Sequence, residues 1–333
     1  MRTVSRDPRP RDGGFPARPE PPLPIAISQC LLGSTVRYDG SEAGFALPHA
    51  ALAGVFQYRG ICPEVGIGLG TPREPIRLVG DVAVPRVLGV NDPTLDVTAA
   101  LREYARSQAA LLDEVAGYVF MRGSPSCGLF DVKVYPVEDG VVGQVAVRSG
   151  RGGYAAAVVA ARPTLPVEEN GRLHDPLLRE NFVVRTFAYA HWRALERAGI
   201  SRARLIEFHS RYKYLLMAHS VPHYQQAGRL LSNLDDLQAS ADAYVTLLMT
   251  GLFRVAGRRG HANVLAHLHG YFKRHLDGPR RRELDGLIHA YRRGEVPLRQ
   301  PLDGLRDHLR RYPDAFVEQQ AYLDLYGRDR ERA

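Results

Sequence analysis

The pattern of apolar residues changes in kind partway along this 333-residue chain. Up to about residue 170, short apolar runs end in turns of Gly, Pro, Ser or Cys, as buried strands do. From Ser201 onward such runs nearly vanish, and apolar residues recur at helical spacing instead. A chain of this length also exceeds one average domain. The change of pattern therefore predicts an α/β domain followed by a separate all-α domain.

The α/β domain is expected to span residues 23–170 and to contain a Rossmann-like parallel sheet. Between its strands, apolar residues recur at helical spacing over residues 97–115 and 155–161, which predicts two helices. Asp96 is suited to cap the first of them. Strands that alternate with helices are typical of parallel sheets with covering helices. The predicted strands lie at residues 24–28, 54–61, 117–121 and 165–167.

The remaining segments differ in composition from this domain. Residues 1–22 are rich in Pro, Arg and Gly and lack periodic apolar positions, so we expect a disordered tail. Residues 171–200 predict a connecting helix, and residues 201–333 an all-helical domain. The amphipathic stretches of that domain lie at residues 201–219, 224–233, 240–254, 262–275, 279–293 and 302–312.

Positive charge is concentrated in the helical domain. Residues 201–333 contain 22 Lys and Arg against 15 Asp and Glu, and so carry most of the net charge of +8. Such a module could bind a polyanion, although a solvated basic surface explains the charge equally well. The apolar runs fall far short of the roughly 20 residues of a membrane-spanning helix, and the N-terminus lacks a signal-type segment. We expect a soluble, cytoplasmic protein that does not contact a membrane.

The three cysteines are too few for a disulfide framework, and their odd number points to free thiols or metal ligands. Cys30, Cys62 and Cys127 each follow a predicted strand, and the carboxyl ends of parallel strands share one edge of a sheet. Three converging thiolates suit either a zinc site lacking its fourth ligand or an iron–sulfur cluster with one open iron. Because short Cys-x-x-Cys pairs are absent, the cluster is favoured; three unrelated buried thiols are the alternative.

Three motifs occur in order around these cysteines: residues 28–33 (SQCLLG) with 37–40 (RYDG), 62–64 (CPE) with 68–73 (GLGTPR), and 124–128 (SPSCG). Together they resemble the thiouracil desulfidase family over about residues 24–170.

The helical half carries four further motifs: residues 209–220 (HSRYKYLLMAHS), 263–267 (NVLAH), 270–273 (GYFK) and 291–298 (YRRGEVPL). With these, it resembles the YbgA-type domain that is often fused to the first family. The arrangement is similar to that of bacterial thiouridine desulfurases, which remove sulfur from 4-thiouridine in tRNA.

The resemblance implies a [4Fe-4S] cluster held by Cys30, Cys62 and Cys127, with its fourth iron open to the sulfur of a thiocarbonyl. The implied reaction is hydrolytic and not redox, and it yields uridine and hydrogen sulfide. The resemblance also implies that Glu64 and Ser124 serve the chemistry. Two departures concern substrate positioning: Gly66 stands where related fusions often have an acidic residue, and Met121 where a Lys is frequent.

Each candidate side chain has a chemical and a purely structural interpretation. Glu64 could activate water or move a proton, and Ser124 could position water or substrate, whereas Asp39, Ser126 and Arg37 are expected to bind substrate. Alternatively, Glu64 caps a helix after Cys62, the two serines shape their turn, and Asp39 closes another turn.

In the helical domain, basic residues interleaved with aromatic ones are candidates for RNA contacts. The aromatic residues recur at helical spacing and are more often core than stacking platforms. A base inside folded RNA must be flipped out before it can react, which explains an attached RNA-binding module. A desulfidase for free thiouracil and a non-enzymatic iron–sulfur RNA-binding sensor remain alternatives, and the oligomeric state is open. The candidate RNA-binding residues are Arg211, Lys213, Lys273, Arg274, Arg292 and Arg293.

Overall fold

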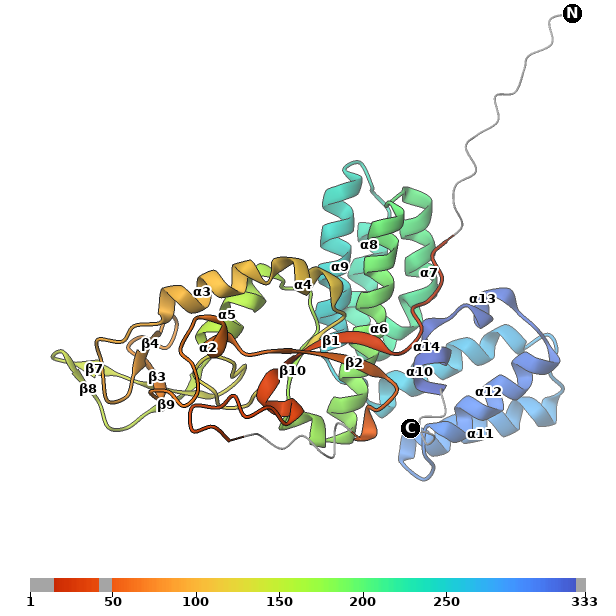
Figure 1. The fold of residues 1–333 in the computed structure, drawn as a ribbon. Coiled ribbons are helices and arrows are strands. Elements are labelled where there is room, and N and C mark those ends of the chain that lie inside the picture. The colour runs from red at the N-terminus through yellow and green to blue at the C-terminus, as the bar shows by residue number, and fades with distance from the viewer. Residues whose placement is uncertain (1–14, 42–49, 328–333) are drawn as a thin grey trace, which may run out of the picture.

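The structure, a computed structural model, describes residues 15–41 and 50–327. The described chain is elongated, with an α/β part at one end and a bundle of helices at the other (Figure 1). The predicted order of an α/β domain followed by an all-α region is confirmed. Within the described ranges, no helix is both long enough and apolar enough to span a bilayer.

The central sheet is parallel, as predicted, and its four strands follow the order β10-β5-β1-β2. Their positions match the predicted runs, except that the last strand begins at Val167 rather than two residues earlier. Side chains such as Ile25 and Val119 are fully buried in this sheet, which is why the runs are apolar throughout. The strands are β1 (Leu23–Ser28), β2 (Phe56–Ile61), β5 (Tyr118–Phe120) and β10 (Val167–Glu169).

A second sheet, of order β4-β3-β6-β9, was not predicted. It is mixed: β3 runs antiparallel to β4 and parallel to β6, and β6 runs antiparallel to β9. None of its strands exceeds four residues, so period-two alternation has too few positions to stand out in the sequence. The strands are β3 (Ile76–Val79), β4 (Arg86–Gly89), β6 (Val132–Tyr135) and β9 (Val147–Gly150), with a hairpin of β7 (Val137–Glu138) and β8 (Val141–Val142) between the last two.

Helices cover the central sheet. The predicted helix 97–115 is split at Gln108 into α3 (Thr98–Ser107) and α4 (Ala109–Glu114), and α3 packs against α5 (Gly153–Ala161). From the helical region, α6 (Pro176–Ala198) packs on β1, and the ring of Phe182 meets that of Phe56 with centroids 5.8 Å apart.

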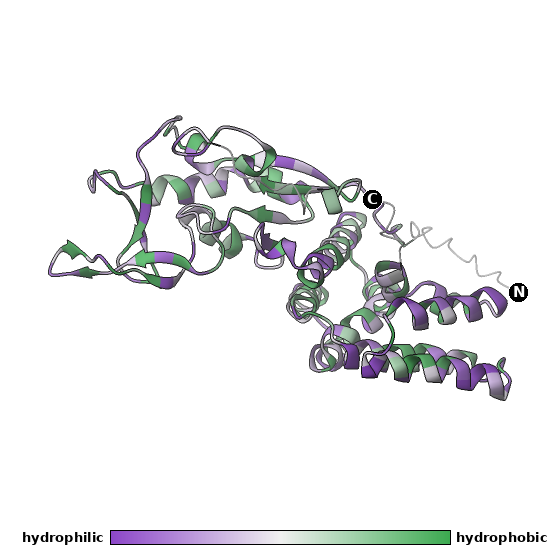
Figure 2. Ribbon diagram, turned by 90° about the horizontal axis from the view of Figure 1, so that it is seen from below, coloured by the Kyte–Doolittle hydropathy of each residue, from purple (hydrophilic) through white to green (hydrophobic). Residues whose placement is uncertain are grey.

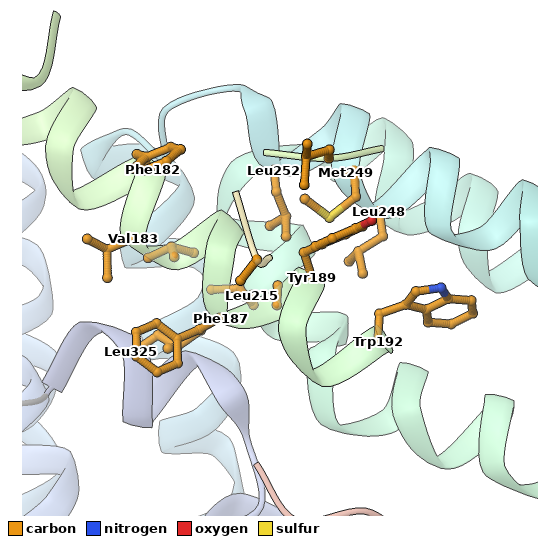
Figure 3. Close-up of a cluster of buried hydrophobic side chains, with 14 of the residues drawn as sticks. Phe182, Val183, Phe187, Tyr189, Trp192, Leu215, Leu248, Met249, Leu252 and Leu325 are labelled. Atoms are coloured by element: carbon orange, nitrogen blue, oxygen red, sulfur yellow. The ribbon is translucent and has the colours of Figure 1, made fainter. Parts of the chain in front are cut away.

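The expected connecting helix, α6, is largely buried and lies at the centre of the helical region. Its Tyr189 and Trp192 pack with Leu248 and Met249 in a continuous apolar cluster (Figure 3). Asp175 caps its first turn by accepting hydrogen bonds from two backbone N–H groups. The following helices alternate hydrophilic and hydrophobic stretches, as amphipathic helices do (Figure 2). They are α7 (Arg202–His219), α8 (Val221–Leu230), α9 (Leu237–Phe253), α10 (Arg258–His269), α11 (Gly278–Arg293), α12 (Arg299–Arg311), α13 (Ala315–Glu318) and α14 (Ala321–Gly327).

The segment before β1 departs from the predicted disordered tail. Residues 1–14 lie outside the described residues, but Phe15 packs its ring edge-on against His191, with centroids 5.5 Å apart. The carbonyl of Pro16 is 3.0 Å from the Nε2 of the same histidine, and Arg18 forms an ion pair with Asp324. The composition argument did not anticipate these contacts of Phe15, Pro16 and Arg18 with the helices.

Burial keeps four histidines of the helical region uncharged. It lowers the pKa of His191, His209 and His219 to about 4 and that of His261 to about 3. His219 illustrates the arrangement: its Nδ1 lies 2.5 Å from the carbonyl oxygen of Arg254, and its Nε2 lies 2.7 Å from the hydroxyl of Tyr326. The neutral ring satisfies both contacts, because Nδ1 can donate to the carbonyl oxygen while Nε2 accepts from the hydroxyl.

We expect this protein to lose stability steeply as the pH falls from about 6.5 to 4. In that window the unfolded chain protonates His191, His209, His219 and His261 while the folded chain does not, so protonation favours unfolding. Each histidine contributes up to about 1.4 kcal/mol per pH unit, or roughly 5–6 kcal/mol per pH unit for all four. Urea unfolding at pH 7 and pH 5 measures the slope. A His261→Gln variant should reduce it by about a quarter; an unchanged slope would contradict the assignment.

Candidate active site

The three cysteines, far apart in sequence, line one cavity of about 350 Å³. Cys30 lies in the 3-10 helix Gln29–Leu32 that follows β1, Cys62 follows β2 directly, and Cys127 lies in the loop after β5. Strand β1 lies between β5 and β2, and all three run parallel, so their carboxyl ends open on the same edge.

All three thiols are free, and their surroundings oppose ionisation. Burial raises the pKa of Cys30 to about 11, with a further contribution from the neighbouring Cys62, and burial likewise raises the pKa of Cys62 and Cys127. Neutral thiols are poor ligands, whereas a bound metal centre supplies the positive charge that stabilises thiolates. The site therefore favours thiolates only when a cationic centre is bound.

The chemistry of the donors fits one kind of metal centre. The cavity of about 350 Å³ is lined by three thiols, and cysteine thiolates are the usual ligands of iron–sulfur clusters, one at each of several irons. Cys30, Cys62 and Cys127 are therefore the residues that could hold such a cluster.

Glu64 is the one acidic side chain that lines the cavity in the described ranges, and it is held from two sides. It lies in the first turn of α2 (Pro63–Gly66), a helix that begins directly after Cys62 with proline in its first turn. The Nε of Arg73 donates to its Oε2 at 2.8 Å, and the hydroxyl of Ser126 donates to its Oε1. The carboxylate faces these partners and the cavity, so its role is not confined to the helix terminus.

Arg73 received no role in the sequence analysis, although it closes the motif that begins at Cys62. Its side chain is only 4% exposed, and its guanidinium also donates to the carbonyl oxygens of Val36 and Gly70, both at 2.8 Å. Arg73 thus joins three segments around Glu64. A basic residue placed shortly after an acidic candidate within one motif was the signal that could have identified it.

The two serines of the third motif have different positions. Ser124 lines the cavity, and its Oγ accepts hydrogen bonds from the backbone N–H of Ser126 at 3.3 Å and of Cys127 at 3.1 Å. Ser126 is fully buried, with its Oγ 3.0 Å from that of Ser124. A hydrogen-bonded chain thus runs from Ser124 through Ser126 to Glu64. Both serines shape the turn, and together they connect the cavity to the carboxylate.

Of the remaining predicted site residues, Arg37 and Asp39, only the first lines the cavity. Arg37 lines the cavity, and its charge partly opposes the effect of burial on the pKa of Cys30. Asp39 does not line it; its carboxylate accepts from the N–H and hydroxyl of Ser41, and these bonds hold its pKa below the usual value. The turn-closing interpretation of Asp39 accounts for its contacts, and those contacts offer nothing to a substrate in the cavity.

The structure explains the first departure from the family pattern and places the second at the cavity. A Cβ atom on Gly66 would lie 2.3 Å from ring carbons of Tyr104, so this position admits no side chain without moving that ring. Met121 lines the cavity, and its backbone N–H donates to Ser28 Oγ at 3.0 Å.

Two buried residues at the end of β10 hold the loop that contains Cys127. The carboxylate of Glu169 accepts from the N–H groups of Leu129 at 2.8 Å and Phe130 at 3.0 Å, and the side chain of Asn170 accepts from the N–H of Arg122 at 2.9 Å. The sequence analysis regarded this region only as the end of the domain. Consecutive polar residues at the end of a buried strand were the available signal.

Two of the basic residues predicted to bind RNA are engaged inside the protein. Arg211 pairs with Glu207, and its guanidinium lies 4.2 Å from the ring centroid of Phe15. The ammonium of Lys213 lies 4.6 Å from the ring centroid of Phe316, and burial lowers the pKa of this lysine.

The other four predicted RNA-binding residues are exposed. Arg293 forms an ion pair with Glu295, and the remaining three, Lys273, Arg274 and Arg292, lie after α10 and at the end of α11. These elements are at the end of the molecule away from the cavity (Figure 1). The interleaved aromatic residues Tyr212, Phe272 and Tyr291 are core residues, as their helical spacing suggested.

Comparisons with known proteins divide the chain in the same way as its fold. Residues 25–170 match the family described as 2-thiouracil desulfurase, and residues 213–327 match a family described as a protein of unknown function (DUF1722). The protein YbgA of Escherichia coli (strain K12) is 37% identical over 155 residues, covering 45% of this chain and 90% of YbgA. The protein YbbK of Bacillus subtilis (strain 168) is 31% identical over 112 residues, covering 31% of this chain and 72% of YbbK.

Among solved structures, one titled [4Fe-4S]-dependent thiouracil desulfidase TudS is 29% identical. The alignment covers 46% of this chain and 93% of that one, with a TM-score of 0.35. The first family match covers the α/β part with its three-cysteine cavity, and the second falls within the helical part. This chain belongs to the 2-thiouracil desulfurase family through its α/β domain, to which a DUF1722 domain is joined.

Proposed function

We propose that this protein is a [4Fe-4S]-dependent desulfidase that removes sulfur from 4-thiouridine in tRNA and yields uridine and hydrogen sulfide. The observation that carries the proposal is the meeting of three free thiols and the Glu64 carboxylate in one cavity. Membership of the 2-thiouracil desulfurase family supports a thiolated pyrimidine as the reacting group. A tRNA substrate would place the reaction in the cytoplasm.

Cys30, Cys62 and Cys127 would hold three irons of the cluster, each on a different loop at the edge of the parallel sheet. When bound, such a cluster supplies an open iron that acts as a Lewis acid toward the thiocarbonyl sulfur. The loop that carries Cys127 is held by hydrogen bonds from the N–H groups of Leu129 and Phe130 to the buried carboxylate of Glu169, so this ligand is positioned before substrate arrives.

Glu64 would act as the base that takes a proton from the attacking water. Its ion pair with Arg73 keeps the carboxylate fixed. The hydrogen bond from Ser126, which is in turn hydrogen-bonded to Ser124, connects the carboxylate to the cavity. The water oxygen bonds to C4 of the pyrimidine ring as the C–S bond breaks, and sulfur leaves as hydrogen sulfide with the two protons of that water. The net reaction is a hydrolysis, so it requires no oxidant or reductant.

The attached helical domain supports an RNA substrate rather than a free base. A nucleotide within folded RNA must leave its stack to enter the cavity, and the binding energy for that step comes from contacts elsewhere on the RNA. Lys273, Arg274 and Arg292 are exposed cations of this domain that could meet phosphates.

The experiment that tests the function uses protein purified without oxygen, with iron and sulfide counted before the assay. Bulk tRNA is then incubated with catalytic amounts of protein while 4-thiouridine absorbance and released sulfide are followed. We expect several turnovers with equal loss of thiouridine and gain of sulfide. Turnover of free thiouracil with tRNA left intact would replace the tRNA proposal with the free-base alternative. Iron binding without turnover of either substrate would favour the sensor.

A further inference from the structure

Arg122 is a cation of the cavity that neither the sequence motifs nor the proposed reaction uses. Three arginines line the cavity together with the carboxylate of Glu64, and one of them, Arg73, is bound to that carboxylate. A second, Arg37, acts on Cys30, where its charge opposes the effect of burial on the pKa of the thiol. In the part of the chain that the structure describes, Arg122 forms no ion pair and its guanidinium donates no hydrogen bond. Its charge is therefore available to a ligand.

Arg122 lies at the opening of the cavity. Among the described residues that line the cavity, only Arg122 and Tyr38 have exposed side chains, and Tyr38 is 44% exposed. Cys127 is 5% exposed and lies deeper. A pyrimidine whose thiocarbonyl sulfur approached the thiols would therefore keep its sugar and phosphate toward the opening, on the side of Arg122.

The position of Arg122 is fixed by its neighbours. Its backbone N–H donates to Asn170 Oδ1 at 2.9 Å, and the N–H of Met121 donates to Ser28 Oγ at 3.0 Å. The side chain lies along Gly171, since a Cβ atom on that glycine would be 2.9 Å from Cδ and 3.5 Å from Nη1 of the arginine. This packing restricts the arginine stem, which reduces the conformational entropy that a ligand must remove on binding.

A phosphate is the anion that suits this position. In RNA, each nucleotide is flanked by negatively charged phosphates, whereas a free thiobase carries none. The guanidinium group presents its N–H donors in a planar fork that matches two oxygens of a phosphate. A free thiobase in the cavity would leave Arg122 without an anion.

We propose that Arg122 binds the phosphate of the reacting nucleotide and thereby makes the cavity selective for a nucleotide over a free thiobase. The inference rests on the proposed function and deepens it, because it assigns a specificity-determining residue to the same cavity. Gly171 directly precedes the 3-10 helix Arg172–His174 and α6, so Arg122 also lies where the α/β domain joins the helical region.

The test compares two ligands that differ only in a phosphate, uridine and uridine 5′-monophosphate. Each is titrated by ligand-observed NMR against the full-length, iron-loaded protein at low salt. We expect the wild type to bind the monophosphate about tenfold more tightly than uridine, because charge-assisted hydrogen bonds form only with the phosphate. An Arg122→Gln variant should raise Kd for the monophosphate about tenfold and leave Kd for uridine unchanged.

Two further variants complete the comparison. Arg122→Lys keeps the charge but not the planar fork, so Kd for the monophosphate should rise only about threefold. Arg202→Gln is the matched control, because it removes an exposed arginine of α7 in the helical region. This control should bind both ligands as the wild type does.

A wild type that binds the monophosphate no more tightly than uridine would overturn the inference, as would wild-type affinity in Arg122→Gln. Loss of iron in Arg122→Gln, or equal weakening of both ligands, would also overturn it, because either result places Arg122 with the cluster and not with the phosphate. Sulfide release from 4-thiouridine, its 5′-monophosphate and tRNA is measured on the same preparations. If the wild type desulfurates none of them, the proposed function fails while the binding comparison still decides the role of Arg122.

Discussion

A Cys127→Ser variant purified without oxygen should contain almost no iron, against about four atoms per chain in the wild type, and its desulfidase activity should fall to background. Cys127 is only 5% exposed, and the turn that carries it is held by Ser124. Serine matches cysteine in shape, so the turn persists, but its hydroxyl is a poor ligand where a thiolate is required. Iron and sulfide analysis of the purified variant, followed by the tRNA assay, checks the result.

The other two cysteines provide the control for this experiment. If one cluster needs all three ligands, Cys30→Ser and Cys62→Ser must produce the same loss of iron as Cys127→Ser, even though Cys30 and Cys62 are less buried. Three unrelated thiols would instead produce small and unequal changes, limited to stability. A Cys127→Ser variant that retains its iron and activity contradicts the assignment of this ligand.

Replacement of Glu64 by Gln should lower kcat for desulfuration by about 10²- to 10⁴-fold while leaving iron content unchanged, because a positioned proton acceptor is lost but every thiol remains. The same change removes the anion that faces Arg73, whose side chain is only 4% exposed. A buried charge left without its partner destabilises a protein by about 3–5 kcal/mol. Kinetics at a temperature well below the measured Tm separates the two effects.

A double variant, Glu64→Gln/Arg73→Met, distinguishes proton transfer from a structural role. It removes both charges, and a buried ion pair replaced by neutral groups often has little effect on stability, so Tm should recover much of what the single change lost. The double variant does not regain the stability that the hydrogen bonds from Arg73 to Val36 and Gly70 contribute. If Glu64 takes the proton, kcat stays low in the double variant; if activity returns along with stability, the carboxylate is structural.

The parallel sheet and the helices could be predicted because their patterns are strong and local. β1 and β5 are buried on both faces and therefore read as continuous apolar runs, and α6 and α7 repeat their apolar positions over many turns. The second sheet could not be predicted, since strands of four residues or fewer show no period. What holds them together is pairing between segments distant in sequence, such as β3 with β6.

The candidate site could be predicted in its residue types but not in its contacts. The motifs identified Cys30, Cys62, Cys127, Glu64 and Ser124, all of which line the cavity. They did not show that Asp39 lies outside it, because a turn residue and a ligand-binding residue look alike in sequence.

The amino-acid sequence by itself determined which chemistry is available here: three thiols after strands, a carboxylate beside one of them, and a basic helical domain. The tertiary structure alone decided which groups act together. It joined Arg73 and Ser126 to Glu64, used Arg211 and Lys213 in internal contacts, and placed Arg122 at the opening of the cavity. Backbone patterns are local and can be read along the chain. Ion pairs, burial and register depend on which distant segments meet, and these are determined only by the folded chain.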